Sequence, residues 1–179
     1  MLHGKIKNMN IKNNKILILD FGSQFTQLIA RRIREAGVYC EVWPWDVDFA
    51  LIGEFNPKGL VLSGGPESVH LDDGPKVNGQ VFELGIPVFG ICYGMQVIAH
   101  YFGGTVIPSD EKEFGYAHIT LKNDSKLLDG IFDEKAGQLD VWMSHGDKVD
   151  VMPEGFHVTS NSATAPVTSF ENQDSTIFG

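Results

Sequence analysis

The chain has 179 residues, with 14 Lys and Arg against 23 Asp and Glu, so its formal net charge at pH 7 is −9. Hydrophobic residues make up 42% of the sequence and charged residues 21%, which is typical of globular proteins and excludes disordered and fibrous classes. The acidic balance argues against binding to nucleic acids or anionic membranes, because such surfaces require clustered Lys and Arg. No apolar stretch approaches the ~18 residues that a membrane-spanning helix needs.

The length fits one domain, which we place at residues 15–179. The preceding residues 1–14 are rich in Lys and Asn and lack the apolar core of a secretory signal, so we interpret them as a flexible leader. Two cysteines, Cys40 and Cys92, are expected to be free thiols in the reducing cytoplasm. The histidines are scattered and no C-x-x-C motif occurs, so the sequence predicts no metal site.

Short apolar runs alternate with amphipathic segments in the first half of the chain. The runs predict strands at 15–20, 38–43, 59–62 and 86–91, and the amphipathic segments predict helices at 24–36, 75–84 and 94–102. The strand runs are continuously apolar, as is typical of strands buried on both faces. They predict an α/β fold of the flavodoxin-like, doubly wound kind, with a mostly parallel sheet and helices on both faces. A few antiparallel strands are expected later, at 116–121, 157–159 and 166–170.

Cys92 stands where the strand at 86–91 runs into the following helix, with Gly90 and Gly94 on either side. This is the pattern of a nucleophile elbow. The helix N-terminus would favour the thiolate and lower the pKa of the thiol, and the N–H of Tyr93 would point toward a developing oxyanion. The alternative is a buried structural cysteine that happens to lie between two glycines.

A second motif, Ser63-Gly64-Gly65-Pro66, follows the preceding strand. It should therefore lie at the same carboxyl edge of the sheet as Cys92, where open α/β sheets bind ligands. One N–H of this turn, together with that of Tyr93, would form a two-donor oxyanion hole. The alternative is an ordinary Gly-Gly-Pro turn.

A polar run at 144–147 follows the apolar segment 139–143 and indicates a loop that lines a cleft. His145 in this run is a candidate general base for Cys92. The alternative is a loop histidine with no catalytic role.

These motifs resemble the triad-type, or class I, glutamine amidotransferases. The segment 90–96 (GICYGMQ) and the Ser-Gly-Gly-Pro turn carry the resemblance to the family as a whole. Three longer segments, at 18–27, 113–117 and 140–149, are similar to its GMP synthetase branch. The similarity extends from about residue 15 to residue 179, so the domain is identified as a type 1 amidotransferase domain.

The resemblance implies a cysteine glutaminase. Cys92 would attack the side-chain amide of L-glutamine, release ammonia and form a γ-glutamyl thioester that water hydrolyses. Gly65 and Tyr93 would supply the oxyanion hole. The remaining site residues that it implies are Gly64, Gln96, Ser144 and His145 as glutamine-binding residues, and Gly146 and Asp147 as pocket or domain-interface residues.

The resemblance also implies partners outside this chain. In the whole enzyme, an ATP-pyrophosphatase synthetase domain would use the ammonia, ATP and Mg²⁺ to convert XMP to GMP, and the full-length enzyme would be a homodimer. No cofactor is expected within the chain itself.

One departure from the family concerns the general base. In the family, a His-Pro-x-Glu-type motif supplies the base and its orienting carboxylate, and this sequence contains no His-Pro and ends at Gly179 shortly before that position. We therefore expect a C-terminally truncated piece of a longer protein that is nearly inactive alone, since general acid–base help is worth about 10²–10⁴-fold in rate. The alternatives are a catalytically dead module that binds glutamine or a partner, and a stand-alone amidotransferase subunit.

Overall fold

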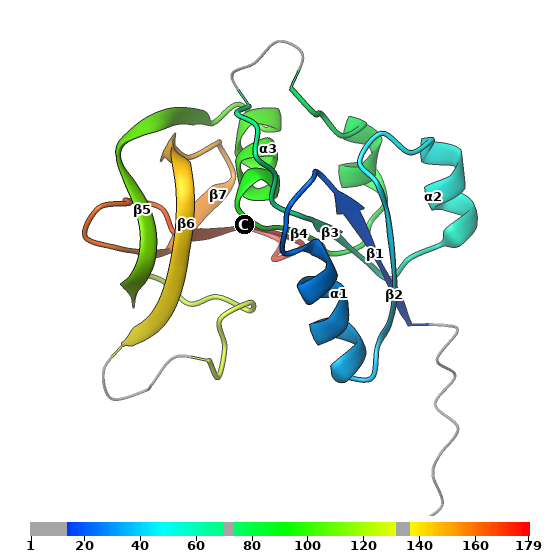
Figure 1. Cartoon of the computed structure of the whole chain (residues 1–179), viewed down its shortest axis with the longest axis horizontal. Coiled ribbons are helices and arrows are strands. Elements are labelled where there is room, and N and C mark those ends of the chain that lie inside the picture. The colour runs from blue at the N-terminus through cyan, green and yellow to red at the C-terminus, as the bar shows by residue number, and fades with distance from the viewer. Residues whose placement is uncertain (1–13, 70–73, 132–136) are drawn as a thin grey trace, which may run out of the picture.

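The computed structural model describes residues 14–69, 74–131 and 137–179, without the side chains of residues 110–114, 144 and 145. The expected leader, apart from residue 14, lies outside this part of the chain. The described strands form one nine-stranded sheet in the order β2-β1-β3-β4-β9-β8-β7-β5-β6. Helices cover the parallel half of this sheet (Figure 1). The predicted fold class, a mixed α/β domain with a large, mostly parallel sheet, is confirmed.

The sheet has a parallel half and an antiparallel half. The parallel strands are β1 (Lys15–Asp20), β2 (Tyr39–Pro44), β3 (Gly59–Leu62), β4 (Val88–Gly90) and β9 (Ile177–Phe178). The antiparallel pairings involve β5 (Thr105–Leu121), β6 (Gln138–Val151), β7 (Phe156–Asn161) and β8 (Ser169–Asn172). The helices are α1 (Thr26–Glu35), α2 (Phe49–Phe55) and α3 (Tyr93–Tyr101), with a short 3₁₀ helix, η1 (Gly79–Glu83).

The alternating side chains of β1 divide the core between the two faces of the sheet. Leu17 and Leu19 are fully buried in the larger cluster, which also takes side chains from α2, η1 and α3. Ile18 points the other way and packs with Ala30 of α1 and with Cys40 of β2. Both faces of the strand are therefore covered, which explains its continuous apolar sequence.

The prediction of a regular helix at 75–84 is wrong. The segment forms only the 3₁₀ helix η1, which begins after Asn78, whose side chain accepts a hydrogen bond of 3.0 Å from the N–H of Gln80. Before this cap, the carbonyl of Pro75 accepts a hydrogen bond of 2.7 Å from the hydroxyl of Tyr93. The first part of the segment is thus held against α3 by a contact distant in sequence, and it does not coil.

Helix α2 was not anticipated from the sequence. Its seven residues are too few for a clear helical periodicity. Its two ends are marked by short polar residues: the side chain of Asp48 accepts a hydrogen bond of 2.9 Å from the N–H of Ala50, and Asn56 adopts a left-handed conformation with φ of +50°. These are standard signals for a helix start and a helix end.

Strands β5 and β6 form a long, curved ribbon at the left of the molecule (Figure 1). The prediction of a loop at 144–147 is wrong, because this segment continues β6. His145 pairs with Glu113 and Asp147 with Pro108, and the register of the ribbon shifts between Pro108 and Glu113. A polar run that looks like a loop is therefore a strand paired with an equally polar partner.

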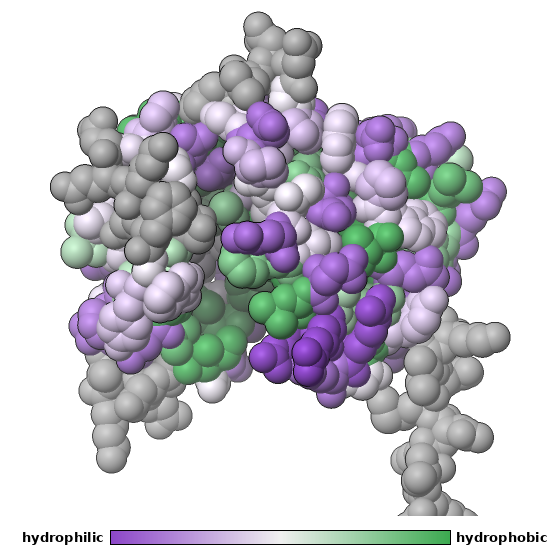
Figure 2. Space-filling model, in the orientation of Figure 1, coloured by the Kyte–Doolittle hydropathy of each residue, from purple (hydrophilic) through white to green (hydrophobic). Residues whose placement is uncertain are grey.

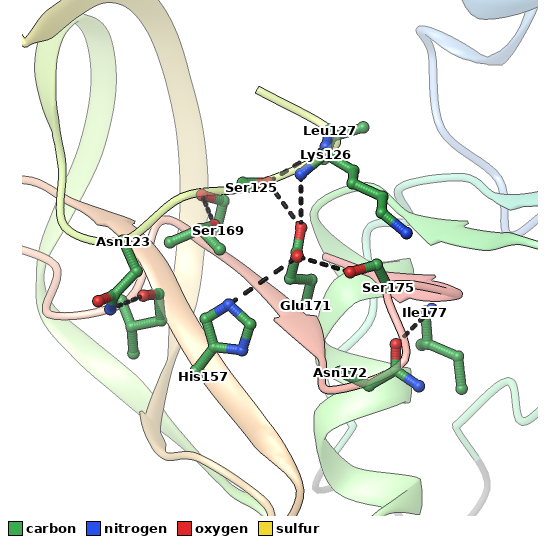
Figure 3. A network of polar contacts seen from close by, with 12 residues as sticks. Asn123, Ser125, Lys126, Leu127, His157, Ser169, Glu171, Asn172, Ser175 and Ile177 are labelled. Atoms are coloured by element: carbon green, nitrogen blue, oxygen red, sulfur yellow. Dashed lines mark hydrogen bonds and ion pairs between the residues drawn. The ribbon is translucent and has the colours of Figure 1, made fainter. Parts of the chain in front are cut away.

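A buried carboxylate ties the end of the chain to the antiparallel half. Glu171 of β8 is 4% exposed, and its Oε2 accepts hydrogen bonds from the hydroxyl of Ser125 at 2.8 Å and the N–H of Lys126 at 3.1 Å. Its Oε1 accepts one from the hydroxyl of Ser175 at 3.0 Å and lies 3.9 Å from Nε2 of His157 (Figure 3). These contacts hold the β8–β9 turn in place and thereby position β9.

Strand β9 runs alongside β4 in the same direction. Ile177 pairs with Val88 and Phe178 with Phe89. The C-terminal end of β9 therefore lies next to the C-terminal end of β4, where β4 leads into α3. Figure 1 marks the C-terminus close to that junction.

Candidate active site

Cys92 occupies the junction between β4 and α3 in a strained backbone conformation. Its φ is +54° and its ψ is −110°, and it serves as the N-cap of α3. A non-glycine residue in such a region costs about 1–3 kcal/mol and is found mainly at functional sites. The sharp turn from strand into helix is that of a nucleophile elbow, as the sequence pattern predicted.

The two flanking glycines are required by close backbone contacts. A Cβ atom at Gly90 would lie 2.5 Å from the carbonyl oxygen of Gly94, and a Cβ atom at Gly94 would collide with the backbone carbonyl of Leu62 in β3. The elbow can therefore pack against the neighbouring strand only with glycine at both positions.

The elbow opens into a cavity of about 950 Å³ at the carboxyl edge of the parallel strands. Figure 2 shows the molecule hollowed between the β5–β6 ribbon and the α1 side, with hydrophobic residues along the hollow. The walls come from residues within the segments 22–25, 64–68, 91–96, 142–149 and 165–168. A separate cavity of about 640 Å³ lies between the start of α2 and the segment 76–80, and Cys92 does not line it.

The Gly-Gly turn after β3 reaches the elbow, as predicted. An added Cβ at Gly64 would lie 3.4 Å from Cβ of Cys92, and one at Gly65 would lie 2.7 Å from the carbonyl oxygen of Phe21. Gly64 therefore lies beside the cysteine, and Gly65 lies close against the turn that follows β1. The oxyanion-hole role of Gly65 stays a prediction.

A buried hydroxyl network shapes this turn. Ser63 is fully buried, and its Oγ accepts a hydrogen bond of 3.0 Å from the N–H of Phe21 and donates one of 2.8 Å to the carbonyl of Gly64. The carboxylate of Asp20 accepts a hydrogen bond of 2.7 Å from the hydroxyl of Thr26 at the start of α1. The turns that follow β1 and β3 are thus fixed to each other beneath the cavity.

The side chain of Tyr93 anchors the start of α3. It is 1% exposed, its ring centroid lies 5.4 Å from that of Phe21, and its hydroxyl is bound to the carbonyl of Pro75. Burial raises the pKa of this hydroxyl. Because the side chain is held at both ends, the backbone N–H of Tyr93 keeps a fixed direction beside Cys92.

Comparison with known proteins matches this arrangement to one family. The sequence agrees with the family described as "Glutamine amidotransferase class-I" over residues 17–179. The chain belongs to this family. Among curated relatives, this class I amidotransferase is 54% identical over 174 residues to a glutamine-hydrolysing GMP synthase of Alteromonas mediterranea and 55% identical over 174 residues to that of Idiomarina loihiensis. Each match covers 95% of this chain but 33% of the relative, so the chain spans about a third of their length.

Solved structures agree with this assignment. A Thermoplasma acidophilum protein, described as one subunit of a putative GMP synthase, superposes with a TM-score of 0.75 and 29% identity, over 92% of this chain and 81% of that one. A glutamine amidotransferase of Thermotoga maritima superposes with a TM-score of 0.72 and 17% identity, over 93% of this chain and 74% of that one. The second comparison shows a shared fold.

The thiol of this class I amidotransferase does not have the lowered pKa that its helix terminus led us to expect. Cys92 reaches solvent through the cavity, but the protein around it desolvates the thiol, and this raises its pKa. A hydrogen bond from the backbone of Tyr93 lowers the pKa in part, and the negative charge of Asp147 raises it further. The net direction is upward, because the loss of hydration outweighs the single stabilising contact.

Gln96 and the segment 144–147 meet at the cavity wall. Gln96 is 6% exposed, and its side-chain Nε2 donates a hydrogen bond of 3.1 Å to the backbone carbonyl of Asp147. Gly146 and Asp147 line the cavity together with Gln96. Ser144 and His145 belong to β6, but their side chains lie outside the described part of the chain, so their predicted binding roles stay predictions.

Some cavity residues were not predicted. The turn at 22–25, the segment 165–168 and the exposed Trp142 all line the cavity. The first could have been anticipated, because β1 ends at the same sheet edge as β3 and β4. The other two come from the antiparallel half, whose placement beside the elbow has no local sequence signal.

In the described part of the chain, no helix is long and apolar enough to cross a membrane. The same residues contain no group of three or more His, Cys, Asp or Glu that could hold a metal ion.

Proposed function

We propose that this chain is the glutamine-hydrolysing domain of a GMP synthase and that Cys92 is its nucleophile. The observation that carries the proposal is the strained elbow at Cys92, open to a cavity of about 950 Å³. The identity of more than half of the aligned residues to glutamine-hydrolysing GMP synthases supports it. A cytoplasmic location fits the two free cysteines, Cys40 and Cys92.

The reaction begins when the thiolate of Cys92 attacks the side-chain amide carbon of L-glutamine and the carbonyl electrons move onto the oxygen. The N–H groups of Gly65 and Tyr93 donate hydrogen bonds to this oxyanion, and each such donor is worth about 2.7–4 kcal/mol. The C–N bond then breaks, the nitrogen takes up a proton and leaves as ammonia, and a γ-glutamyl thioester remains. Water attacks the thioester, which releases glutamate and restores the thiol.

The substrate would be held between the elbow and β6. Gly64 and Gln96 lie on the elbow side, and Ser144 and His145 would approach from β6. Gly146 and Asp147 complete the pocket or face a neighbouring domain. The contact between Gln96 and the carbonyl of Asp147 supports this arrangement, because it sets the distance between the two walls.

The raised pKa of Cys92 makes a general base necessary at neutral pH. Among the described side chains, no histidine lines the cavity. We propose that the base follows β9, because Phe178 pairs with Phe89, three residues before Cys92. His145 is the alternative base within the chain.

The ammonia would pass to a synthetase domain that converts XMP to GMP with ATP and Mg²⁺. The support for this part is the length of the relatives, of which the chain covers a third. No residue of this chain is assigned to ATP, Mg²⁺ or a dimer contact.

A second arrangement is a separate amidotransferase subunit. The relative from Thermoplasma acidophilum is described as a subunit, and this chain covers 81% of it. The intact mass of the native gene product decides between the two arrangements. A chain that continues into a nucleotide-binding domain supports a single-chain synthase, and one that ends shortly after a His-Pro-x-Glu motif supports a subunit.

The proposal is tested by labelling Cys92 with a glutamine-shaped diazoketone and by measuring glutamate formation. We expect labelling that L-glutamine prevents and that Cys92→Ala abolishes, with little turnover by the 179-residue chain alone. Absence of labelling or of protection would contradict a glutamine pocket. Robust turnover that His145→Ala abolishes would show that His145 is the base, and the proposed base after β9 would then be wrong.

A further inference from the structure

We infer that Phe21 is a positioning residue of the oxyanion hole, because it contacts both residues whose N–H groups are proposed to bind the oxyanion. The inference rests on the proposed function, in which Gly65 and Tyr93 supply these groups. Phe21 directly follows β1 and does not line the cavity beside Cys92. It would therefore act through its two neighbours and not on the substrate.

The first contact joins the backbone of Phe21 to Gly65. A Cβ atom added at Gly65 would lie 2.7 Å from the carbonyl oxygen of Phe21 and 3.1 Å from its Cβ. The N–H of Phe21 also donates a hydrogen bond of 3.0 Å to Oγ of Ser63, which is fully buried at the start of the Gly-Gly turn. The backbone of Phe21 is thus held directly against the turn that carries the first donor.

The second contact joins the ring of Phe21 to the ring of Tyr93. The two ring centroids lie 5.4 Å apart with an interplanar angle of 53°, and this separation is typical of favourable aromatic pairs. Phe21 is 3% exposed and Tyr93 is 1% exposed, and a close-packed interior leaves neither ring room to shift alone. A displacement of the ring of Phe21 therefore passes to the first residue of α3.

Trp45 supports Phe21 from the end of β2. Its ring is stacked on that of Phe21, with centroids 6.3 Å apart and an interplanar angle of 16°. Its N–H donates a hydrogen bond of 3.3 Å to the carbonyl of Asp20, the residue before Phe21. The position of Phe21 is therefore set by packing against the end of β2 as well as by β1.

The expected effect of losing this support is confined to reactions that form an oxyanion. Donors stabilise the oxyanion only when they point at the place where it forms, and a misplacement of about 1 Å can cost about 100-fold in rate. Phe21→Leu keeps an apolar side chain but removes the ring that packs against Tyr93. We expect it to slow reactions of Cys92 that pass through an oxyanion about 10- to 100-fold and to leave direct displacement at the thiol unchanged.

The experiment compares two reactions of Cys92 in the same chain. In the first, the thiolate attacks the ester carbonyl of mono-4-nitrophenyl glutarate, which has the skeleton of glutamine without the amino group. A tetrahedral oxyanion forms with the new C–S bond, the C–O bond then breaks, and 4-nitrophenolate leaves with the bonding electrons, the thiol proton having passed to the buffer. In the second, the thiolate displaces iodide from iodoacetamide, and no oxyanion forms. Both reactions require the thiolate, so the ratio of their rate constants at one pH cancels the ionised fraction.

Phe156→Leu is the matched control. The half-buried ring of Phe156 contacts those of Phe102 and Phe170 in the same hydrophobic cluster that contains Phe21. Its removal should lower the free energy of unfolding in urea, as Phe21→Leu does, but leave the ratio of acylation to alkylation unchanged. A purely structural role of Phe21 would make the two variants alike.

The outcomes separate the inference from the proposed function. A fall in the ratio for Phe21→Leu, with none for Phe156→Leu, supports the inference. An unchanged ratio in Phe21→Leu, or an equal fall in both variants, overturns it while the nucleophile stands. Where Phe21→Leu does not fold, Trp45→Leu decides in the same way, because it keeps Phe21 and removes the ring stacked on it. If the wild-type protein releases no more 4-nitrophenolate than Cys92→Ala, the proposed function itself fails.

Discussion

The side-chain amide of Gln96 donates a hydrogen bond of 3.1 Å to the backbone carbonyl of Asp147, a residue 51 positions further along the chain. This bond joins α3, which begins directly after Cys92, to β6 in the antiparallel half. Gln96 is almost fully buried, so its side-chain amide cannot readily exchange the bond for one to water. The contact holds together the two walls between which the substrate is proposed to bind.

Replacement of Gln96 by leucine should destabilise the domain. The carbonyl of Asp147 would lose its partner at a part-buried position, and the loss of such a hydrogen bond costs about 1 kcal/mol in the free energy of unfolding. Urea unfolding followed by circular dichroism measures this loss. The control is Gln24→Leu, at an exposed position of the same cavity, which should change stability by less than about 0.5 kcal/mol. Equal stability of the two variants would show that the hydrogen bond between Gln96 and Asp147 does not contribute to the free energy of unfolding.

Gly94→Ala should be strongly destabilising, although alanine is normally the better helix former. The added methyl group would meet the backbone carbonyl of Leu62 in β3, and overpacking of this kind costs about 1–3 kcal/mol or more. Gly53→Ala in α2 is the matched control, because nothing lies within 4 Å of its added Cβ. We expect thermal unfolding to show a lower midpoint for the first variant and an unchanged or higher midpoint for the second. A neutral effect at Gly94 would contradict the close approach of α3 to β3.

The alkylation rate of Cys92 should depend on pH with an apparent pKa above that of an ordinary thiol. Desolvation and the charge of Asp147 both disfavour the thiolate, and the thiolate is the reactive form. Removal of a negative charge favours the thiolate, so Asp147→Asn should shift the rate profile toward lower pH. Rates measured by iodoacetamide labelling and peptide mass analysis separate Cys92 from the buried Cys40. A profile already saturated below neutral pH would disprove the raised pKa.

Glu171→Gln should weaken the attachment of the β8–β9 turn. The carboxylate accepts hydrogen bonds from Ser125, Lys126 and Ser175, and the amide nitrogen of glutamine cannot accept any of them. We expect a loss of about 1–3 kcal/mol in the free energy of unfolding, measured in urea. Asp174→Asn, on the exposed part of the same turn, should leave stability nearly unchanged. An equal effect of both changes would indicate a loss of surface charge rather than of a buried network.

The sequence predicted the parallel half of the fold and the elbow because both depend on local patterns. Continuous apolar runs mark strands that are covered on both faces, and the run at 59–62 matches β3 residue for residue. The spacing of Gly90, Cys92 and Gly94 marks the turn, since glycine alone fits on either side of it. Because parallel strands end at the same carboxyl edge of the sheet, the sequence also predicted that the Gly-Gly turn lies near Cys92.

The tertiary structure decided the features that depend on partners distant in sequence. The polar run at 144–147 is a strand because β5 pairs with it, and the segment 75–78 does not coil because Tyr93 holds Pro75. The direction of the Cys92 pKa shift follows from desolvation by the surrounding protein and from the charge of Asp147 on another element. Local sequence determined that a cysteine stands in the sharp turn between β4 and α3. Packing between the two halves decided what surrounds it, because hydration and charge at a site depend on every element that lies against it.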